Sequence, residues 1–473
     1  MQIIKKETIS YFLNLLEKRH IECHALSICQ NGHVLLEKAF SPYTLESLHP
    51  VYSVTKSFTS MAIGFLEAEG KLNIENSWIS YFPEYEEYVA DKQFYDVTIK
   101  HLLTMSLGQD CEVEVTKDDN WIFTILGKKL AYQPGTVYLY NSHCSHLLSA
   151  LVTKLSHQKM SDYLKTKLFI PLDIHNYYWQ EDLQGNNIGG YGLHISIHDL
   201  MKFGKCCLDG GMYEGKQVLP KQWLDKATTI QMKNVDAYPL NRSENRQGYG
   251  LHFWMCTHGA YRMSGLHAQL CFIQPENKLV IAMFNNSSGS QAVLDCWFQA
   301  VEDQIEMSEQ SSFQLPTVEG LIGEDFLNDY LNQKMRAYTN DFQFNWLSLK
   351  KNADKIEISI CKNNQVFSVV AGYHDWYAQE NNFHTFNTFM TYDSLVNEQP
   401  PNIENTLFAC YGWQTNTTLI VEIRELDHSA RTVLKFAFDY FHVVLYYSVT
   451  GLYTNVTETK CIFQNTENEM KRN

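Results

Sequence analysis

A serine and a lysine three residues apart, Ser53 and Lys56, have the types and spacing that nucleophilic catalysis needs. A serine hydroxyl is a weak nucleophile until a nearby base takes its proton, and a lysine at position i+3 lies on the same face of a helix. Burial lowers the pKa of a lysine amine, so a desolvated Lys56 could act as that base. A helix start at Ser53 would also offer a backbone NH and the helix dipole to an oxyanion.

The same spacing occurs twice more, at Ser156–Lys159 and at Ser348–Lys351. Ser53 differs from these serines because two β-type runs precede it and the strongly apolar stretch SVTKSFTSMAIGFLEAEG begins with it. Ser156 ends a predicted helix, and Ser348 lies beside paired lysines in a β-rich region. The sequence therefore favours Ser53, and the alternative is a helix-start serine with a lysine that extends to solvent.

The composition is that of a globular protein with more than one domain. The chain has 473 residues, of which 45% are hydrophobic and 19% charged. A net charge of -15 and the lack of a basic stripe argue against a nucleic-acid partner. The N-terminal stretch lacks the apolar core of a signal peptide. The sequence has no run of about 18 apolar residues, so we do not expect a membrane as a partner.

The cysteines and histidines predict no disulfide framework and no metal site. Twelve cysteines are scattered without a C-x-x-C spacing, which favours a reducing, cytoplasmic location. Four histidines cluster in the sequence without a carboxylate or histidine partner set at ligand spacing; they are His143, His146, His194 and His198. We therefore expect neither a metal nor a cofactor.

The elements around Ser53 predict an α/β (α+β) domain over residues 1–310. Asn31-Gly32 lies between two β-type runs and predicts a hairpin, and the stretch from Ser53 to Gly70 predicts a buried helix. Further segments are expected as helices at 98–106, 143–157, 160–168, 196–208 and 290–304, and as three strands within 249–286. This order predicts an antiparallel sheet with the terminal helices on one face and a helical insert on the other side.

A second domain, all-β and barrel-like, is expected over residues 320–473, after a linker near residues 302–320. Short β-type runs separated by turn residues occupy 355–361, 365–372, 406–414, 417–425, 432–439 and 442–449. Their regular spacing is typical of a barrel or sandwich.

A second motif makes a family resemblance specific. In QPGTVYLYNSHCSHLLSALV a Pro-Gly turn leads to Tyr140-Asn141-Ser142 and then to a Leu-Leu helix. This stretch resembles the second motif of the serine β-lactamase-like family, which includes class C β-lactamases, penicillin-binding proteins and family VIII-type esterases. The segments LFIPLDIHNYYW, GGYGLHISIHDLMKFGKCCLDGGMYEGKQVLP and SGLHAQLCFIQPENKLVIAMFNN resemble later parts of the same family, and the resemblance covers roughly residues 15–305.

The resemblance implies a catalytic site formed by three residues. Ser53 would attack a carbonyl to form an acyl-enzyme, while Lys56 and Tyr140 would share the proton transfers. The oxyanion hole would pair the NH of Ser53 with an NH of the third motif, which counting back from Pro275 assigns to Gln269.

Four further residues in the two later motifs are candidates for the oxyanion or substrate-binding site: Asn141, Ser142, Gly265 and His267.

Two departures from the family pattern bear on the substrate. Leu266 stands where a cationic residue would bind a substrate carboxylate, and Ser142 stands where an asparagine would contact the substrate amide. Both weaken a β-lactamase assignment more than a hydrolase assignment. We therefore predict a serine hydrolase that cleaves a small ester, amide or short peptide, of the carboxylesterase or D-peptidase/amidase type. The alternative is a non-catalytic, penicillin-binding-protein-like ligand-binding or regulatory protein.

Overall fold

The computed structural model describes residues 2–116, 119–303, 327–328, 330–340, 344–380, 406–425, 431–439, 442–450 and 456–464. The chain divides into two compact units, and the main boundary between them lies between Phe313 and Gln314. The short segment Phe40–Tyr43 is grouped with the second unit. Nearly all of the predicted linker lies outside the described residues. Each unit is described by itself below.

The first unit combines one large sheet with helices and short turns. Its helices are α1 (Lys6–Lys18), α2 (Thr55–Ala68), α3 (Ile99–Leu103), α4 (Trp121–Leu126), α5 (Ser142–Ser156), α6 (Met160–Leu164), α7 (Ile197–Leu208), α8 (Lys221–Ala227) and α9 (Ser290–Asp303). Short helical turns are η1 (Tyr52–Val54), η2 (Trp78–Tyr81), η3 (Pro83–Tyr88), η4 (Lys92–Asp96), η6 (Ser243–Asn245), η7 (Leu266–Ala268), η8 (Pro275–Asn277) and the π-helical η5 (Lys165–Phe169).

The large sheet of the first unit is antiparallel and runs in the order β2-β1-β11-β10-β9-β8. Its strands are β1 (Glu22–Gln30), β2 (His33–Ala39), β8 (Trp254–Met255), β9 (Tyr261–Ser264), β10 (Leu270–Gln274) and β11 (Leu279–Asn286). Shorter pairings involve β3 (His49–Pro50), β4 (Tyr178–Trp179), β5 (Leu193–Ile195), β6 (Met212–Tyr213) and β7 (Lys216–Gln217).

The predicted hairpin joins β1 to β2. Gln30 pairs with His33, and the two turn residues between them, Asn31 and Gly32, have φ values of 53° and 80°. Such a two-residue turn with positive φ matches the right-handed twist of the flanking strands. The hairpin prediction is thus confirmed.

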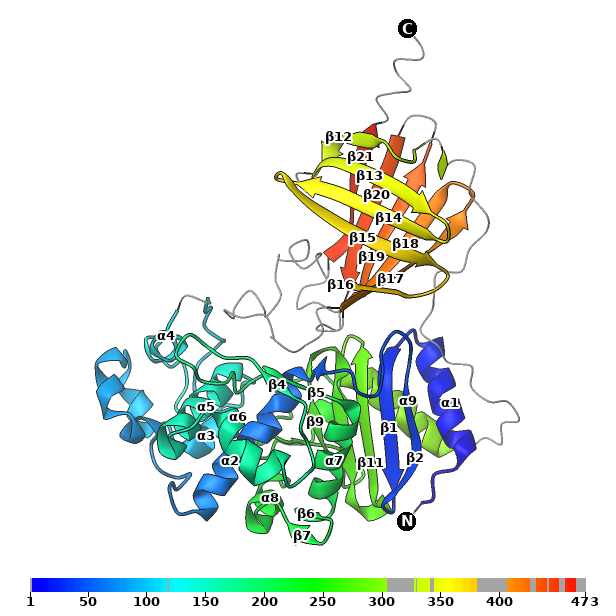
Figure 1. Ribbon diagram of the computed structural model, residues 1–473. Coiled ribbons are helices and arrows are strands. Elements are labelled where there is room, and N and C mark those ends of the chain that lie inside the picture. Colours follow the sequence, from blue (N-terminus) through cyan, green and yellow to red (C-terminus); the bar gives the residue numbers. More distant parts are fainter. Residues whose placement is uncertain are drawn as a thin grey trace. The chain divides into compact units, whose positions relative to one another are not determined.

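Helices cover both faces of the sheet (Figure 1). On one face α1 packs on α9, with the rings of Phe12 and Trp297 edge to face at 5.4 Å. On the other face α7 lies against β10 and β11, and Gly204 permits this approach because a Cβ there would lie 2.6 Å from the Cys271 sulfur. Burial of these apolar faces is the main force that holds the layers together.

The predicted strands between 249 and 286 need one correction. The run AYRMSGLHAQLCFIQPE was expected to be a single strand, but it forms two strands, β9 and β10, separated by the turn η7. His267 and Ala268 in this turn have φ values of 57° and 66°, which interrupt the extended backbone. Four strands therefore replace the expected three.

The second unit is a closed all-β domain. Its strands are β12 (Lys334–Asn340), β13 (Phe344–Asn352), β14 (Lys355–Lys362), β15 (Gln365–Tyr373), β16 (Tyr377–Glu380), β17 (Thr406–Thr415), β18 (Thr418–Glu425), β19 (Arg431–Phe438), β20 (His442–Thr450) and β21 (Val456–Gln464). The sheet runs in the order β15-β14-β13-β12-β21-β20-β19-β18-β17-β16, and a parallel pairing of β15 with β17 closes it (Figure 1). Alternate residues of β19 are buried, as expected for a filled barrel. The predicted fold class is confirmed for both units.

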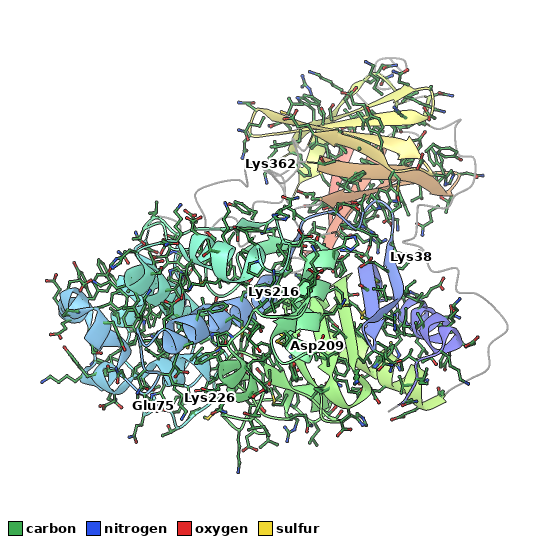
Figure 2. All side chains as sticks on the ribbon, turned by 60° about the horizontal axis from the view of Figure 1, so that its bottom comes forward. Lys38, Glu75, Asp209, Lys216, Lys226 and Lys362 are labelled. Atoms are coloured by element: carbon green, nitrogen blue, oxygen red, sulfur yellow. The ribbon has the colours of Figure 1, made fainter. Side chains whose placement is uncertain are left out.

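The surface and the cysteines complete the description. Within the described ranges no helix is long and apolar enough to cross a membrane. All twelve cysteines carry free thiols, and every one except Cys111 is buried. Charged residues such as Glu75, Asp209 and Lys216, labelled in Figure 2, are exposed on the first unit.

Candidate active site

Ser53 lies in a strained turn directly before helix α2. It belongs to η1, and the helix proper begins two residues later than the sequence predicted, at Thr55. The preceding Tyr52 has a φ of 45°, a conformation that a bulky aromatic residue rarely adopts. The turn is held in place by strand β5, because the NH of Val51 donates to the Leu193 carbonyl at 3.0 Å. Backbone strain of this kind often occurs at functional sites.

Lys56 is buried beside this serine. Its side chain is 1% exposed, and Nζ lies 3.0 Å from the Ser53 Oγ, 3.2 Å from the Ser142 Oγ and 2.8 Å from the Gly190 carbonyl oxygen. Burial lowers the pKa of Lys56 to about 8, and the charge of the Glu112 carboxylate partly opposes that shift. A large fraction of Lys56 is therefore neutral in mildly alkaline solution.

The three oxygen neighbours of Lys56 Nζ can satisfy either protonation state of the amine. A neutral amine has two N–H donors and one lone pair, whereas an ammonium has three donors and no acceptor. The Gly190 carbonyl can only accept, and the Ser142 hydroxyl can accept as well. The ammonium form donates to the Ser53 Oγ as well. In the neutral form the lone pair can instead accept the hydrogen of the Ser53 hydroxyl.

Tyr140 completes the group that the family resemblance implied. Its ring centroid lies 4.8 Å from Lys56 Nζ, and the ring stacks on Trp254 with centroids 5.4 Å apart. A cation over an aromatic face is stabilised by the ring quadrupole. The structure therefore brings Ser53, Lys56 and Tyr140 together.

The two residues after Tyr140 have different environments. Ser142, the first residue of α5, contacts Lys56 as described above. Asn141 is 1% exposed and caps the helix, because its side-chain oxygen accepts the His143 NH at 2.8 Å and its amide donates to Gln109 at 3.2 Å. Ser142 is thus next to Lys56, while both ends of the Asn141 amide are engaged inside the protein.

The third motif approaches Ser53 through Gly265. A Cβ at Gly265 would lie 2.3 Å from the Val51 carbonyl and 3.2 Å from the Ser53 nitrogen. Only glycine fits at this close approach. The motif is therefore packed directly on the turn that carries Ser53.

The expected oxyanion donor Gln269 has other partners. Its NH donates to the Leu266 carbonyl at 3.4 Å, and its fully buried side chain exchanges hydrogen bonds with the backbone of Asn285 at 2.8 and 3.1 Å. The Gln269 NH thus already has an acceptor within its own turn.

His267 lies against the nucleophile turn as a neutral ring. Its side chain is 8% exposed and meets Tyr52 edge to face at 5.5 Å. Burial lowers the pKa of His267 to about 4. Leu266 stands where the family has a cationic residue that binds a substrate carboxylate. The neutral imidazole of His267 cannot replace that positive charge.

Three further residues at the site escaped the sequence analysis. Gly190 supplies a carbonyl to Lys56, and the Gly-Gly pair of the GGYG segment was the signal for it. His252 donates or accepts at the Ser145 hydroxyl at 2.9 Å, and burial and then the charge of Lys56 lower its pKa to about 3. Glu112 accepts a hydrogen bond from the Ser142 NH, and no pattern in the sequence marked it.

The other two Ser-x-x-Lys pairs have ordinary surroundings. Lys159 pairs with both carboxylate oxygens of Glu181 at 2.9 and 2.7 Å. Ser348 lies on strand β13, where residues three apart point to opposite faces of the sheet.

The clustered histidines each contact a different partner. His143 contacts the Val113 carbonyl, His146 contacts Asp182, His194 contacts the Gly192 carbonyl and His198 contacts Glu37. Among the described residues no group of three or more histidines, cysteines or carboxylates is placed to hold a metal ion.

Comparison with known proteins agrees with this architecture. The Beta-lactamase family model matches residues 9–303, which is more than half of the chain. The chain therefore belongs to the beta-lactamase family, whose members are serine hydrolases that act on amide and ester bonds. The resemblance inferred from the motifs is thereby confirmed.

Individual relatives are distant. Protein flp of Staphylococcus aureus is 26% identical over 176 residues, 34% of this chain and 35% of that protein. A beta-lactamase of Escherichia coli is 28% identical over 216 residues, 44% of this chain and 54% of that enzyme. The match thus spans about a third to a half of these relatives. The octameric penicillin-binding protein homologue from Pyrococcus abyssi has a similar fold, with a TM-score of 0.50 and 18% identity over 96% of this chain and 99% of that one.

Proposed function

We propose that this protein hydrolyses an ester or amide bond through an acyl-Ser53 intermediate. The observation that carries the proposal is the 3.0 Å contact between Ser53 Oγ and the buried Lys56 Nζ, whose pKa is lowered to about 8. A neutral amine at this position can take the proton of the hydroxyl as the hydroxyl attacks the carbonyl carbon.

The reaction then follows from the surrounding groups. The NH of Ser53 and a backbone NH of the third motif, which packs on Ser53 through Gly265, would bind the oxyanion of the tetrahedral intermediate. Lys56, together with Tyr140, would return the proton to the departing alcohol or amine, which leaves the acyl group on Ser53. A water molecule would attack this ester by the reverse proton path and release the carboxylic acid.

The residue types around Ser53 favour an esterase, and next an amidase or D-peptidase, over a β-lactamase. Leu266 and the neutral His267 offer no positive charge for the carboxylate that β-lactams carry. Ser142 replaces the asparagine that the family uses to contact a substrate amide. An ester with a small neutral acyl group needs neither a cation for a carboxylate nor an asparagine for an amide.

The test is the intact mass of the protein after treatment with a fluorophosphonate and, separately, with a penicillin. We expect a fluorophosphonate adduct in the wild type and in the Ser348→Ala variant, which removes the serine of a matched Ser-x-x-Lys pair, and no adduct in Ser53→Ala. A steady-state ester hydrolysis assay with the same three proteins detects turnover. No adduct and no turnover in the wild type would contradict the proposal and favour a ligand-binding protein.

A further inference from the structure

Glu112 places a negative charge next to the candidate nucleophile. Its carboxylate Oε1 accepts the NH of Ser142, the first residue of α5. The hydroxyl of the same Ser142 accepts from Lys56 Nζ at 3.2 Å, and that nitrogen lies 3.0 Å from Ser53 Oγ. A single residue therefore separates the carboxylate from the group that would activate the nucleophile.

The carboxylate is fixed in place yet accessible. The hydrogen bond from the helix NH orients it, and the positive end of the α5 dipole favours its charge at that position. Glu112 is nevertheless exposed. Within the described residues its second oxygen, Oε2, has no hydrogen-bond partner, and no lysine, arginine or histidine forms an ion pair with it. The neighbouring Asp110 differs, because it pairs with Lys128 at 2.9 Å.

No positive side chain at the third motif balances this charge. Leu266 is apolar, and burial keeps the neighbouring His267 neutral with a pKa of about 4. Lys56 is buried and occupied by its three neighbours. A ligand beside Ser53 would thus meet a fixed carboxylate and no accessible cation from these residues.

We propose that Glu112 is a specificity-determining residue that selects ester or amide substrates with an ammonium group close to the scissile carbonyl. This inference rests on the proposed acyl-Ser53 hydrolysis and names the substrate class of that same site. The ammonium group would pair with the free Oε2 of Glu112, while an anionic acyl group would be repelled.

The test compares two p-nitrophenyl esters of almost identical shape at neutral pH. The β-alanine ester carries an ammonium group where the butanoate ester carries a methyl group. We expect the kcat/KM of the wild type, relative to the uncatalysed rate, to be about two- to fivefold higher for the β-alanine ester, the size of a solvent-exposed charge pair. The preference should shrink as salt is added, because ions screen an exposed pair.

Charge variants assign the preference to Glu112. Glu112→Gln keeps an oxygen that can accept the Ser142 NH, so only the charge is removed, and the ratio should fall to about one. Glu112→Lys should bring the ratio below one. Glu114→Gln is the matched control, since Glu114 is also exposed and lies two residues further along, and it should keep the wild-type ratio. Using a ratio within each variant cancels any general change in activity.

The outcomes separate the two proposals. A wild-type ratio near one, or a ratio that Glu112→Gln leaves unchanged, overturns the role of Glu112 while hydrolysis of the butanoate ester by Ser53 still stands. If neither ester is turned over and no fluorophosphonate adduct forms at Ser53, the proposed hydrolysis fails and the specificity inference fails with it.

Discussion

The pairs Ser53–Lys56 and Ser348–Lys351 have the same spacing in the sequence and different backbones around them. Lys56 follows Ser53 by one turn at the start of α2, and the two side chains meet at 3.0 Å. Ser348 and Lys351 lie on the extended strand β13 of the barrel, where side chains three residues apart point to opposite faces. A serine and a lysine three residues apart can therefore act together in a helix but not in a strand. Four experiments test this difference between the two units.

The largest effect is expected from removing each lysine. Lys56→Ala removes the base, and the rate of fluorophosphonate labelling should fall by roughly 10²–10⁴-fold, the usual contribution of a positioned proton acceptor. Lys351→Ala in the barrel should leave the rate unchanged. Stopped labelling reactions followed by intact mass give both rates. Equal losses in the two variants would refute the distinction.

The next effect compares two tightly packed glycines. A Cβ would lie 2.3 Å from the Val51 carbonyl at Gly265 and 2.6 Å from the Asp375 carbonyl at Gly372. Gly265→Ala displaces the third motif from Ser53, so labelling should slow by about 100-fold, as when an oxyanion donor is lost.

Gly372→Ala should lower the thermal stability of the barrel and leave labelling unchanged. Thermal unfolding of the full chain, measured beside the labelling rate, separates the two effects. Normal labelling in Gly265→Ala would show that the close approach at that residue does not matter for the nucleophile.

The third effect is on pH dependence. Because the neutral form of Lys56 accepts the proton, kcat/KM should rise with pH and level off above a midpoint near the lowered pKa of about 8. The Glu112 carboxylate stabilises the ammonium form, so Glu112→Gln should move the midpoint to lower pH. Lys351→Ala should not move it. A midpoint that stays in place in Glu112→Gln would rule out this electrostatic coupling.

The smallest effect compares two hydroxyl groups. Ser142→Ala removes one acceptor of Lys56, which should lower kcat/KM by about two- to tenfold, the value of a single hydrogen bond. Ser368→Ala removes a comparable contact in the barrel, the 2.7 Å contact with the Ser359 hydroxyl, and should not change activity. Esterase assays on purified variants check both, and an unchanged rate in Ser142→Ala would exclude a role for that hydroxyl.

Local patterns predicted the regular elements well. The Asn31-Gly32 turn predicted the hairpin, and short β-type runs separated by turn residues predicted barrel strands, because turn and strand preferences depend on neighbours in sequence. The first two motifs also singled out Ser53, Lys56 and Tyr140, and the structure places Lys56 beside both of the others.

The third motif and the loops resisted such prediction. LHAQLCF has the composition of one continuous strand, yet positive φ at His267 and Ala268 divides it into two strands and a turn. Glu112 lies in a loop without periodicity, and its contact with Ser142 depends on tertiary packing. The spacing of residues in the sequence cannot predict a contact of this kind, because it joins two segments that are distant in the chain.

The strand order of the first unit also constrains how the site forms during synthesis. Strand β1 lies in the sheet next to β11, so that Glu22 pairs with Asn286. At a synthesis rate of about 5–20 residues per second, β11 is translated on the order of 10–50 s after the β1–β2 hairpin. Ser53 and Lys56 leave the ribosome early, but the third motif that packs on them is translated much later. The arrangement around Ser53 is therefore among the last features of its unit to form, and until then the edge of β1 is open to wrong partners or to chaperones.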